Sequence, residues 1–351
     1  MVVNIDAELS TVDRPIRQTQ PLRDKDRAQR EAQAGECLTI GLLNNMAGAA
    51  FKNTERQFIS LLDAASAGIP VHVSFYTLPG LSLTESGGQQ FARHYASVDA
   101  LLSTQLDGLI VTGREPKFAS LRDEPYWQSF TQVLEWARNN TCSAIWSCLA
   151  AHAAVLHMDG IDRRKSDEKN FGVFECEQAS DHLFTQGLTP RFHVPHSRWN
   201  GVAREDLLAH GYSILSSITN DGVDTFIKQG KSLFLFFQGH PEYESDTLMR
   251  EYRRDLARFL KGETSVYPLL PGGYFDRDTE RALTALRDES GASRNAQLLL
   301  KVASVVENAP ITNTWQRSAT TIYRNWFNEI RARKHEHAAD SRSVESMAIS
   351  E

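Results

Sequence analysis

Short apolar segments follow one another at regular intervals through the first part of this chain, and they limit the folds that the sequence can adopt. Residues 38–43 and 107–113 are runs of the kind found in strands that are buried on both faces of a sheet. Residues 71–78 alternate as a strand does, and residues 143–147 form a further apolar strand. These strands therefore predict a sheet whose two faces are both covered by other parts of the chain.

Helical patterns lie between these strands. One opens at Thr54 and Glu55 and stops at Gly68, and another runs from about Pro125 to Asn139. Strands that alternate with helices predict an α/β fold, in which a mostly parallel sheet has helices on both faces in three layers. Ligands bind such sheets at the carboxyl ends of the strands. That edge would carry residues 44–48, residues 113–117 and Cys148.

The rest of the chain suggests how the domain is organised. Residues 1–36 are polar and predict an N-terminal arm, and residues 37–330 predict a single α/β domain. Shorter β-like pieces occupy residues 171–237, and a long helix follows through Leu260. Within that domain, residues from about 263 to 330 predict a helical C-terminal extension that packs on it. Residues 335–351 predict a disordered tail.

Charge and cysteine content exclude several classes of protein. The 351 residues carry a formal net charge of −6 without a basic stripe, which argues against nucleic acid as a partner and favours small-molecule substrates. The four cysteines form no CxxC pair, so we expect neither a metal site nor a disulfide framework. No apolar run is long enough to span a membrane, and no secretory leader is recognisable. We expect a cytoplasmic protein, and the sequence leaves a homodimer open.

Cys148 occupies a position suited to a nucleophile. It follows the apolar strand at residues 143–147 and precedes a helix of small residues. A thiolate at such a turn is stabilised by the helix dipole and by converging N–H groups, with the N–H of Leu149 as the expected oxyanion donor. The alternative is a buried structural cysteine, because free cysteines are usually buried.

His240 and Glu242 are the candidates for the base and its orienting carboxylate. They end another apolar strand, and residues two apart in an extended segment face the same way, so the carboxylate can fix the imidazole tautomer. A solvated turn is the competing interpretation of this His-Pro-Glu sequence. The other histidines considered, which are weaker candidates, are His152, His193, His196 and His210.

With these residues in place, the chain resembles a known family, the bacterial homoserine O-acyltransferases of methionine biosynthesis, which have a glutamine-amidotransferase-like fold. The matching segments span residues 38–327 in the family's order. They include residues 40–44, 54–58, 107–113, 133–136, 168–169, 195–198, 239–243, 254–255 and 315–318, together with Cys148. The resemblance implies an α/β acyltransferase without a bound cofactor and with an acyl-CoA as co-substrate.

The resemblance also implies roles for individual residues. Cys148 would take the acyl group from the acyl-CoA, and His240 with Glu242 would activate the acceptor hydroxyl. Arg254 matches the family's substrate-binding arginine, and Lys169, Ser197 and Arg198 match pocket positions. On spacing, Glu251 and Arg254 share a helix face and could hold the ammonium and carboxylate of an amino acid, although an ordinary surface ion pair is the simpler interpretation.

Two loops depart from the family pattern, and both line the acyl end of the pocket. The lysine pair expected after Met46 is missing, and only Lys52, shifted along the chain, could replace it. Residues 113–117 read Gly-Arg-Glu-Pro-Lys where the family has Gly-Ala-Pro. Lys117 occupies a position that is Gly in succinyl-using members and Glu in acetyl-using ones. A lysine there would attract a succinyl carboxylate, so the sequence favours succinyl-CoA over acetyl-CoA.

The function predicted is thus transfer of a succinyl or acetyl group from CoA to the hydroxyl of L-homoserine through a cysteine acyl-enzyme. A glutamine-hydrolysing amidotransferase would share the His-Pro-Glu segment, although Trp146 and Ala150 replace the glycines that usually flank its cysteine. An acyltransferase for serine or another hydroxy amino acid is also compatible with the sequence. So is a binding protein without activity.

Overall fold

A computed structural model describes residues 3–5, 37–80, 94–218, 222–290, 294 and 297–348. Its strands form one 11-stranded sheet. Along the sheet, the order is β1 (Val3–Ile5), β3 (Val71–Tyr76), β2 (Leu38–Leu43), β5 (Gly108–Val111), β6 (Ser143–Ser147), β11 (Leu233–Phe237), β10 (Gly222–Lys228), β9 (Ser213–Ile218), β7 (Arg164–Gln178) and β8 (Arg191–Gly201), and β4 (Tyr95–Ala96) pairs with β3.

The sheet has a parallel part and an antiparallel part. From β1 to β11 neighbouring strands run parallel, and β4 is parallel to β3. From β11 to β8 each neighbouring pair is antiparallel. The predicted α/β class with a mostly parallel sheet is confirmed, and the antiparallel part corresponds to the shorter β-like pieces of residues 171–237.

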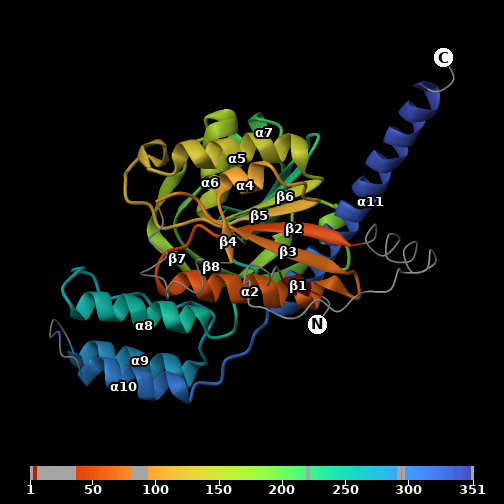
Figure 1. Cartoon of the computed structure of the whole chain (residues 1–351). Helices are drawn as coiled ribbons and strands as arrows, with labels where there is room; N and C mark the ends of the chain where they lie inside the picture. The colour runs from red at the N-terminus through yellow and green to blue at the C-terminus, as the bar shows by residue number, and fades with distance from the viewer. Residues whose placement is uncertain are drawn as a thin grey trace, which may run out of the picture.

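Helices cover both faces of the parallel part (Figure 1). Helix α2 (Ala49–Ser66) and the first turns of α11 (Gln316–Ala348) cover one face, and α4 (Val98–Leu102), α5 (Trp127–Asn140) and α6 (Leu149–Asp159) cover the other. Successive side chains of a strand point to opposite faces. Accordingly, Ile110 of β5 packs with the α2 and α11 side chains, whereas Leu109 and Val111 pack with α5 and α6.

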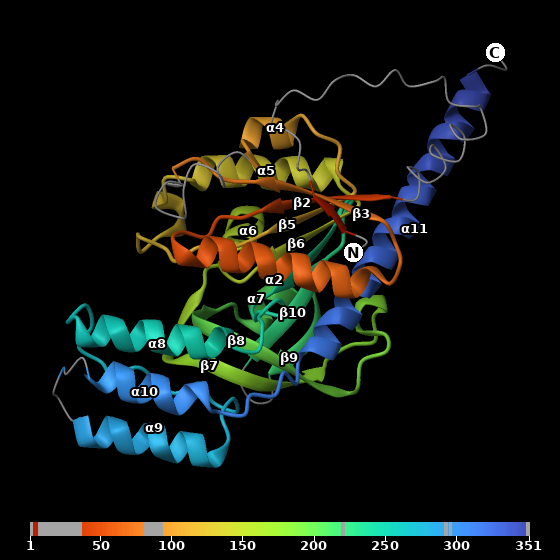
Figure 2. The ribbon, with the colours of Figure 1, turned by 60° about the horizontal axis from the view of Figure 1, so that its bottom comes forward.

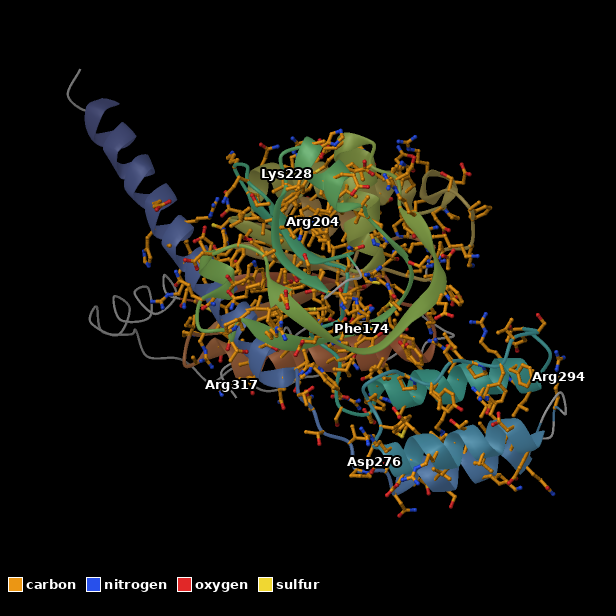
Figure 3. All side chains as sticks on the ribbon, turned by 180° about the vertical axis from the view of Figure 1, so that it is seen from behind. Phe174, Arg204, Lys228, Asp276, Arg294 and Arg317 are labelled. Carbon is orange, nitrogen blue, oxygen red and sulfur yellow. The ribbon has the colours of Figure 1, made fainter. Side chains whose placement is uncertain are left out.

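A third apolar core lies beside the sheet. It joins α8 (Thr247–Leu260), α9 (Arg277–Ser290) and α10 (Gln297–Glu307) through buried side chains such as Tyr252, Leu283 and Val302. Figure 2 shows these three helices together, outside the layers that enclose the sheet. Seen from behind in Figure 3, Asp276 and Arg294 belong to this group of helices, whereas Phe174 lies on the antiparallel part of the sheet. Helix α8 therefore links the site edge of the sheet to the C-terminal helices.

Several boundaries differ from the sequence-based expectations. Helix α2 begins at Ala49 rather than at Thr54. Helix α11 continues to Ala348, through the part of residues 335–351 expected as a disordered tail, and residues 316–348 contain neither Gly nor Pro to interrupt it. In the N-terminal arm, Val3–Ile5 pairs with β3, and residues 6–36 lie outside the described residues.

Two short 3-10 helices and one further α-helix complete the described elements. They are η1 (Leu121–Asp123), η2 (Leu183–Thr185) and α7 (Arg204–Ala209). Among the helices that the structure describes, none combines the length and the apolar character needed to cross a membrane.

The parallel register brings the predicted site loops to one edge. Leu43 of β2 is paired with Val111 of β5, Val111 with Trp146 of β6, and Trp146 with Phe236 of β11. The segments that follow these four strands therefore start at the same level. They carry residues 44–48, residues 112–117, Cys148 and His240, as the alternation of strands and helices predicts.

Candidate active site

Cys148 forms a sharp turn between β6 and α6. Its backbone has φ 52° and ψ −111°, a conformation that residues with a side chain rarely adopt and that marks a strained position. Its N–H donates to the carbonyl of Phe237 at 2.7 Å, and its carbonyl accepts from Ala151 at 3.0 Å. These bonds hold the half-buried sulfur at the edge of the sheet.

The N–H of Leu149 faces the loop after β5. As the first residue of α6, Leu149 has no acceptor for its N–H within the helix. Gly113 approaches so closely that a Cβ at this position would lie 2.8 Å from the Leu149 nitrogen. Only glycine permits this contact, and the loop of residues 113–117 is thereby held against the turn that carries Cys148.

His240 connects Cys148 to Glu242. Its Nδ1 lies 2.8 Å from Oε1 of Glu242, and its side chain lies close enough to Cys148 for the charges of the two groups to interact. The ring stacks on Tyr243 at 4.3 Å between centroids, and the backbone N–H of His240 donates to the carbonyl of Pro195 at 2.8 Å. The structure thus brings together the three residues that the sequence singles out as nucleophile, base and orienting carboxylate.

The electrostatics of this group favour a protonated imidazole. Burial by itself lowers the pKa of His240, but the negative charges of Cys148 and Glu242 outweigh burial and raise that pKa well above its usual range. Both His240 and Glu242 are largely shielded from solvent. A cysteine, an imidazole and a carboxylate in this order are the arrangement of a nucleophile, a base and an orienting group.

Glu251 on α8 is held by two hydroxyl groups. Tyr243 donates to its Oε1 at 2.7 Å, and Ser197 of β8 donates to its Oε2 at 2.5 Å. Because Tyr243 also stacks on His240, the Glu251 carboxylate is linked to the candidate base through one aromatic ring. Tyr243 was not among the residues singled out in the sequence. Its signal there is its place directly after the His-Pro-Glu segment, within residues 239–243 that match the family.

Arg254 and Asp255 of the same helix form a second charged group with Lys169 of β7. Arg254 is half exposed and binds the neighbouring Asp255 at 2.9 Å, and Asp255 also accepts from Lys169 at 3.0 Å. Burial raises the pKa of Asp255, but the charges of Lys169 and Arg254 outweigh it and leave this pKa below its usual value. Glu251 and Arg254, the predicted pair, are therefore held by different partners.

Two predicted site residues lie in less expected places. Arg198 is buried. Its Nε donates to Nδ1 of His196 at 3.3 Å, and its Nη1 donates to the carbonyl of Asn200 at 3.0 Å. Lys117 is exposed, and its backbone N–H donates to Oε1 of Glu124 at 2.5 Å. Neither position could be foreseen, because both residues were assigned from the family pattern alone.

Two arginines near the cysteine were missed. Arg114 is buried, with its guanidinium over the ring of Tyr126 at 5.2 Å from the centroid. Arg163, between α6 and β7, lies close enough to Cys148 for their charges to interact. The departure of residues 113–117 from the family pattern was the only sequence signal for Arg114.

Among the described residues, Cys176, His196 and Asp224 are grouped closely enough to be considered as metal ligands, with their ligand atoms within 4.8 Å of one another. Metal ligation requires a cysteine thiolate. Burial, reinforced by the charge of Asp224, raises the pKa of Cys176 and favours the neutral thiol. The guanidinium of Arg198 beside His196 further disfavours a cation. We therefore interpret this group as a buried hydrogen-bonded cluster.

Comparison with known proteins identifies the family. The model of a family described as homoserine O-succinyltransferase matches residues 3–335. The chain belongs to the homoserine O-succinyltransferase family. Relatives named homoserine O-succinyltransferase include one from Rhodopseudomonas palustris, 44% identical over 86% of this chain and 90% of the relative, and one from Bradyrhizobium japonicum, 40% identical over 83% and 89%. The family resemblance predicted from the sequence is confirmed.

Solved structures with related folds were also found. A glutamine amidotransferase from Methylobacillus flagellatus has a TM-score of 0.44 at 14% identity, covering 84% of this chain and 95% of its own. A glutamine amidotransferase from Thermotoga maritima has a TM-score of 0.41 at 11% identity, covering 84% of this chain and 98% of its own.

Proposed function

We propose that this member of the homoserine O-succinyltransferase family transfers the succinyl group of succinyl-CoA to the hydroxyl of L-homoserine, a step of methionine biosynthesis, through a thioester on Cys148. The observation that carries the mechanism is the position of His240 beside Cys148, with its Nδ1 hydrogen-bonded to Glu242. Family membership supports the succinyl donor and the homoserine acceptor. Because acyl-CoA is an intracellular metabolite, the cytoplasm is the proposed location.

In the first half of the reaction, the Cys148 thiolate attacks the carbonyl carbon of the succinyl thioester. The carbonyl oxygen becomes an oxyanion, which the N–H of Leu149 is placed to stabilise at the N-terminus of α6. The bond to the CoA sulfur then breaks, and the imidazolium of His240 protonates the departing thiolate. The products are free CoA and a succinylated cysteine.

In the second half, neutral His240 removes the proton of the homoserine hydroxyl as its oxygen attacks the Cys148 thioester. The tetrahedral intermediate collapses to O-succinylhomoserine and returns the thiolate, with His240 again protonated. Glu242 holds the imidazole through Nδ1, so that the other ring nitrogen faces the reacting atoms. Each half-reaction therefore leaves the imidazole ready for the next.

The charged groups on α8 suit an amino-acid acceptor. The Glu251 carboxylate, oriented by Tyr243 and Ser197, can receive the ammonium group. Arg254 is half exposed and can bind the substrate carboxylate in a bidentate manner. Arg254 would then exchange its present partner, Asp255, for the substrate carboxylate. Asp255 would keep its ion pair with Lys169.

Mass spectrometry of the intact protein tests the proposal. Incubation with succinyl-CoA, without acceptor, is expected to add one succinyl group to the wild-type protein and none to Cys148→Ala. Cys142→Ala is the matched control, because Cys142 is buried at the opposite end of the same strand, and it should be labelled as the wild type is. Addition of L-homoserine should discharge the adduct, whereas L-glutamine should not. A stable adduct in the presence of homoserine would contradict the acceptor assignment.

A further inference from the structure

The loop of residues 113–117 reaches the nucleophile through Gly113. The contact between Gly113 and Leu149 fixes the start of this loop beside the N–H proposed for the oxyanion. Arg114 is the next residue, so its backbone lies one residue from that contact. An anion bound by the Arg114 side chain would consequently lie in the region of the acyl group of a Cys148 thioester.

Arg114 is a buried cation that lacks an anionic partner within the described part of the chain. Only 9% of the residue is exposed. Its guanidinium carbon lies 5.2 Å from the centre of the Tyr126 ring, which is itself buried. Glu124, the carboxylate of the same loop, is used differently, because its Oε1 accepts the backbone N–H groups of Lys117 and Phe118. The other oxygen of Glu124 is buried without a hydrogen bond, and no ion pair joins this carboxylate to Arg114. A buried guanidinium outside any ion pair can bind an anion that enters the site.

Arg163 adds a second guanidinium to the same region. It is half-buried in the segment between α6 and β7, and burial lowers its pKa, whereas the charges of Tyr126, Glu124 and Cys148 oppose this shift. It therefore lies within electrostatic reach of both the nucleophile and the ring that Arg114 covers. Two guanidinium groups from distant parts of the chain are thus near Tyr126, and that of Arg163 is also within reach of the cysteine.

We propose that Arg114, with Arg163 beside it, binds the terminal carboxylate of the succinyl group and so selects a dicarboxylic acyl donor. The inference rests on the proposed function and names the residues that determine its donor specificity. An acetyl group ends in a methyl group and gains nothing from a guanidinium, whereas a desolvated carboxylate requires a cation or several donors. Lys117, the residue favoured by the sequence, is exposed at its position on the loop.

The test compares the rates at which succinyl-CoA and acetyl-CoA acylate Cys148, followed by intact mass in single-turnover experiments. Arg114→Gln is expected to lower the rate constant with succinyl-CoA roughly 30-fold or more, the effect of losing one partner of a buried charge pair. Acylation by acetyl-CoA should change far less. Arg114→Lys retains the charge and should recover part of the succinyl preference. Arg122→Gln, an exposed arginine in η1, is the matched control.

The outcomes separate this inference from the proposed function. If the wild-type protein gives no succinyl adduct, the proposed function fails and the inference fails with it. If it does, equal losses with both donors in Arg114→Gln would overturn the inference alone, because a general disturbance of the loop does not discriminate between acyl groups. Loss of succinyl preference in Lys117→Ala but not in Arg114→Gln would also overturn it. Thermal unfolding of each variant verifies that the loop change leaves the fold intact.

Discussion

Nε2 of His196 lies 3.1 Å from Oδ1 of Asp224 in the interior behind the catalytic turn, and neither side chain is exposed. Since Nδ1 of His196 accepts a hydrogen bond from Arg198, the neutral imidazole carries its proton on Nε2, the nitrogen beside Asp224. A Cβ on Gly239 would come within 2.8 Å of this nitrogen and 2.9 Å of Oδ1. The pair therefore supports the backbone immediately before His240.

Asp224→Asn should destabilise the protein by about 3 kcal/mol, because removing one partner of a buried pair leaves the other polar group unpaired. Because the pair supports the backbone before His240, the variant should also lower kcat. This fall should be larger than any change in KM for succinyl-CoA or for homoserine. Urea unfolding and steady-state kinetics measure the two effects. Asp159→Asn provides a comparison, since Asp159 forms its ion pair with Lys228 near the surface. A similar loss of stability in both variants would contradict the role assigned to burial.

The same pair predicts how stability depends on pH. Burial raises the pKa of Asp224, but the adjacent His196 and the hydrogen bonds from Thr225 and Ser216 outweigh burial and lower this pKa below the ordinary value. The unfolded chain then binds more protons than the folded one, so this contribution is present above the unfolded pKa and is lost as the pH falls. The stability difference between wild type and Asp224→Asn should therefore shrink below about pH 4. A difference that stays constant down to about pH 3 would refute this.

Gly113→Ala should block acylation while the protein remains folded. The added methyl group would collide with the backbone of Leu149 and displace the proposed oxyanion donor, which predicts a fall in kcat of about 100-fold. Gly41→Ala is the matched control. Gly41 lies on β2 away from the site, and its added methyl group would come within 2.6 Å of the Leu106 side chain. Both variants should lose about 1–3 kcal/mol of stability. Only Gly113→Ala should lose activity, measured per folded molecule.

Within the catalytic group, Cys148→Ala and His240→Ala should each abolish transfer, whereas Glu242→Ala should retain measurable activity. The reason is that an orienting carboxylate contributes less than the groups that make and break bonds. Initial rates with succinyl-CoA and homoserine measure this order. Cys37→Ala and Cys176→Ala should remain active. Full activity of Cys148→Ala would rule out the covalent mechanism.

Arg254→Ala should raise KM for homoserine about tenfold or more, through loss of a charge-assisted bidentate contact, and leave acylation by succinyl-CoA nearly unchanged. Its side chain is 52% exposed, so little stability should be lost. Arg253→Ala tests for effects of a charge change on the same helix. An equal fall in donor acylation would assign Arg254 to the donor or to the fold instead.

The sequence alone determined the class of the fold and singled out the residues proposed as the catalytic group. Apolar runs such as residues 38–43 and 107–113 need cover on both faces, and this requirement specifies a parallel sheet with helices on each side. Within one short segment, backbone geometry also sets relative positions. His240 and Glu242 face the same way because they are two residues apart, and Cys148 is presented because a strand changes into a helix there.

Only the tertiary structure decided which distant segments meet. The pairing of β6 with β11 brings Cys148 to His240, and an apolar run does not specify its neighbour in a sheet, because that choice depends on packing of the whole core. Loops carry still less information, since they have no periodicity that assigns a side chain to one face. For this reason Lys117 proved exposed, Arg114 buried, and Arg198 turned toward His196. The polarity of these residues was evident in the sequence, but their surroundings were set by contacts between elements far apart in the chain.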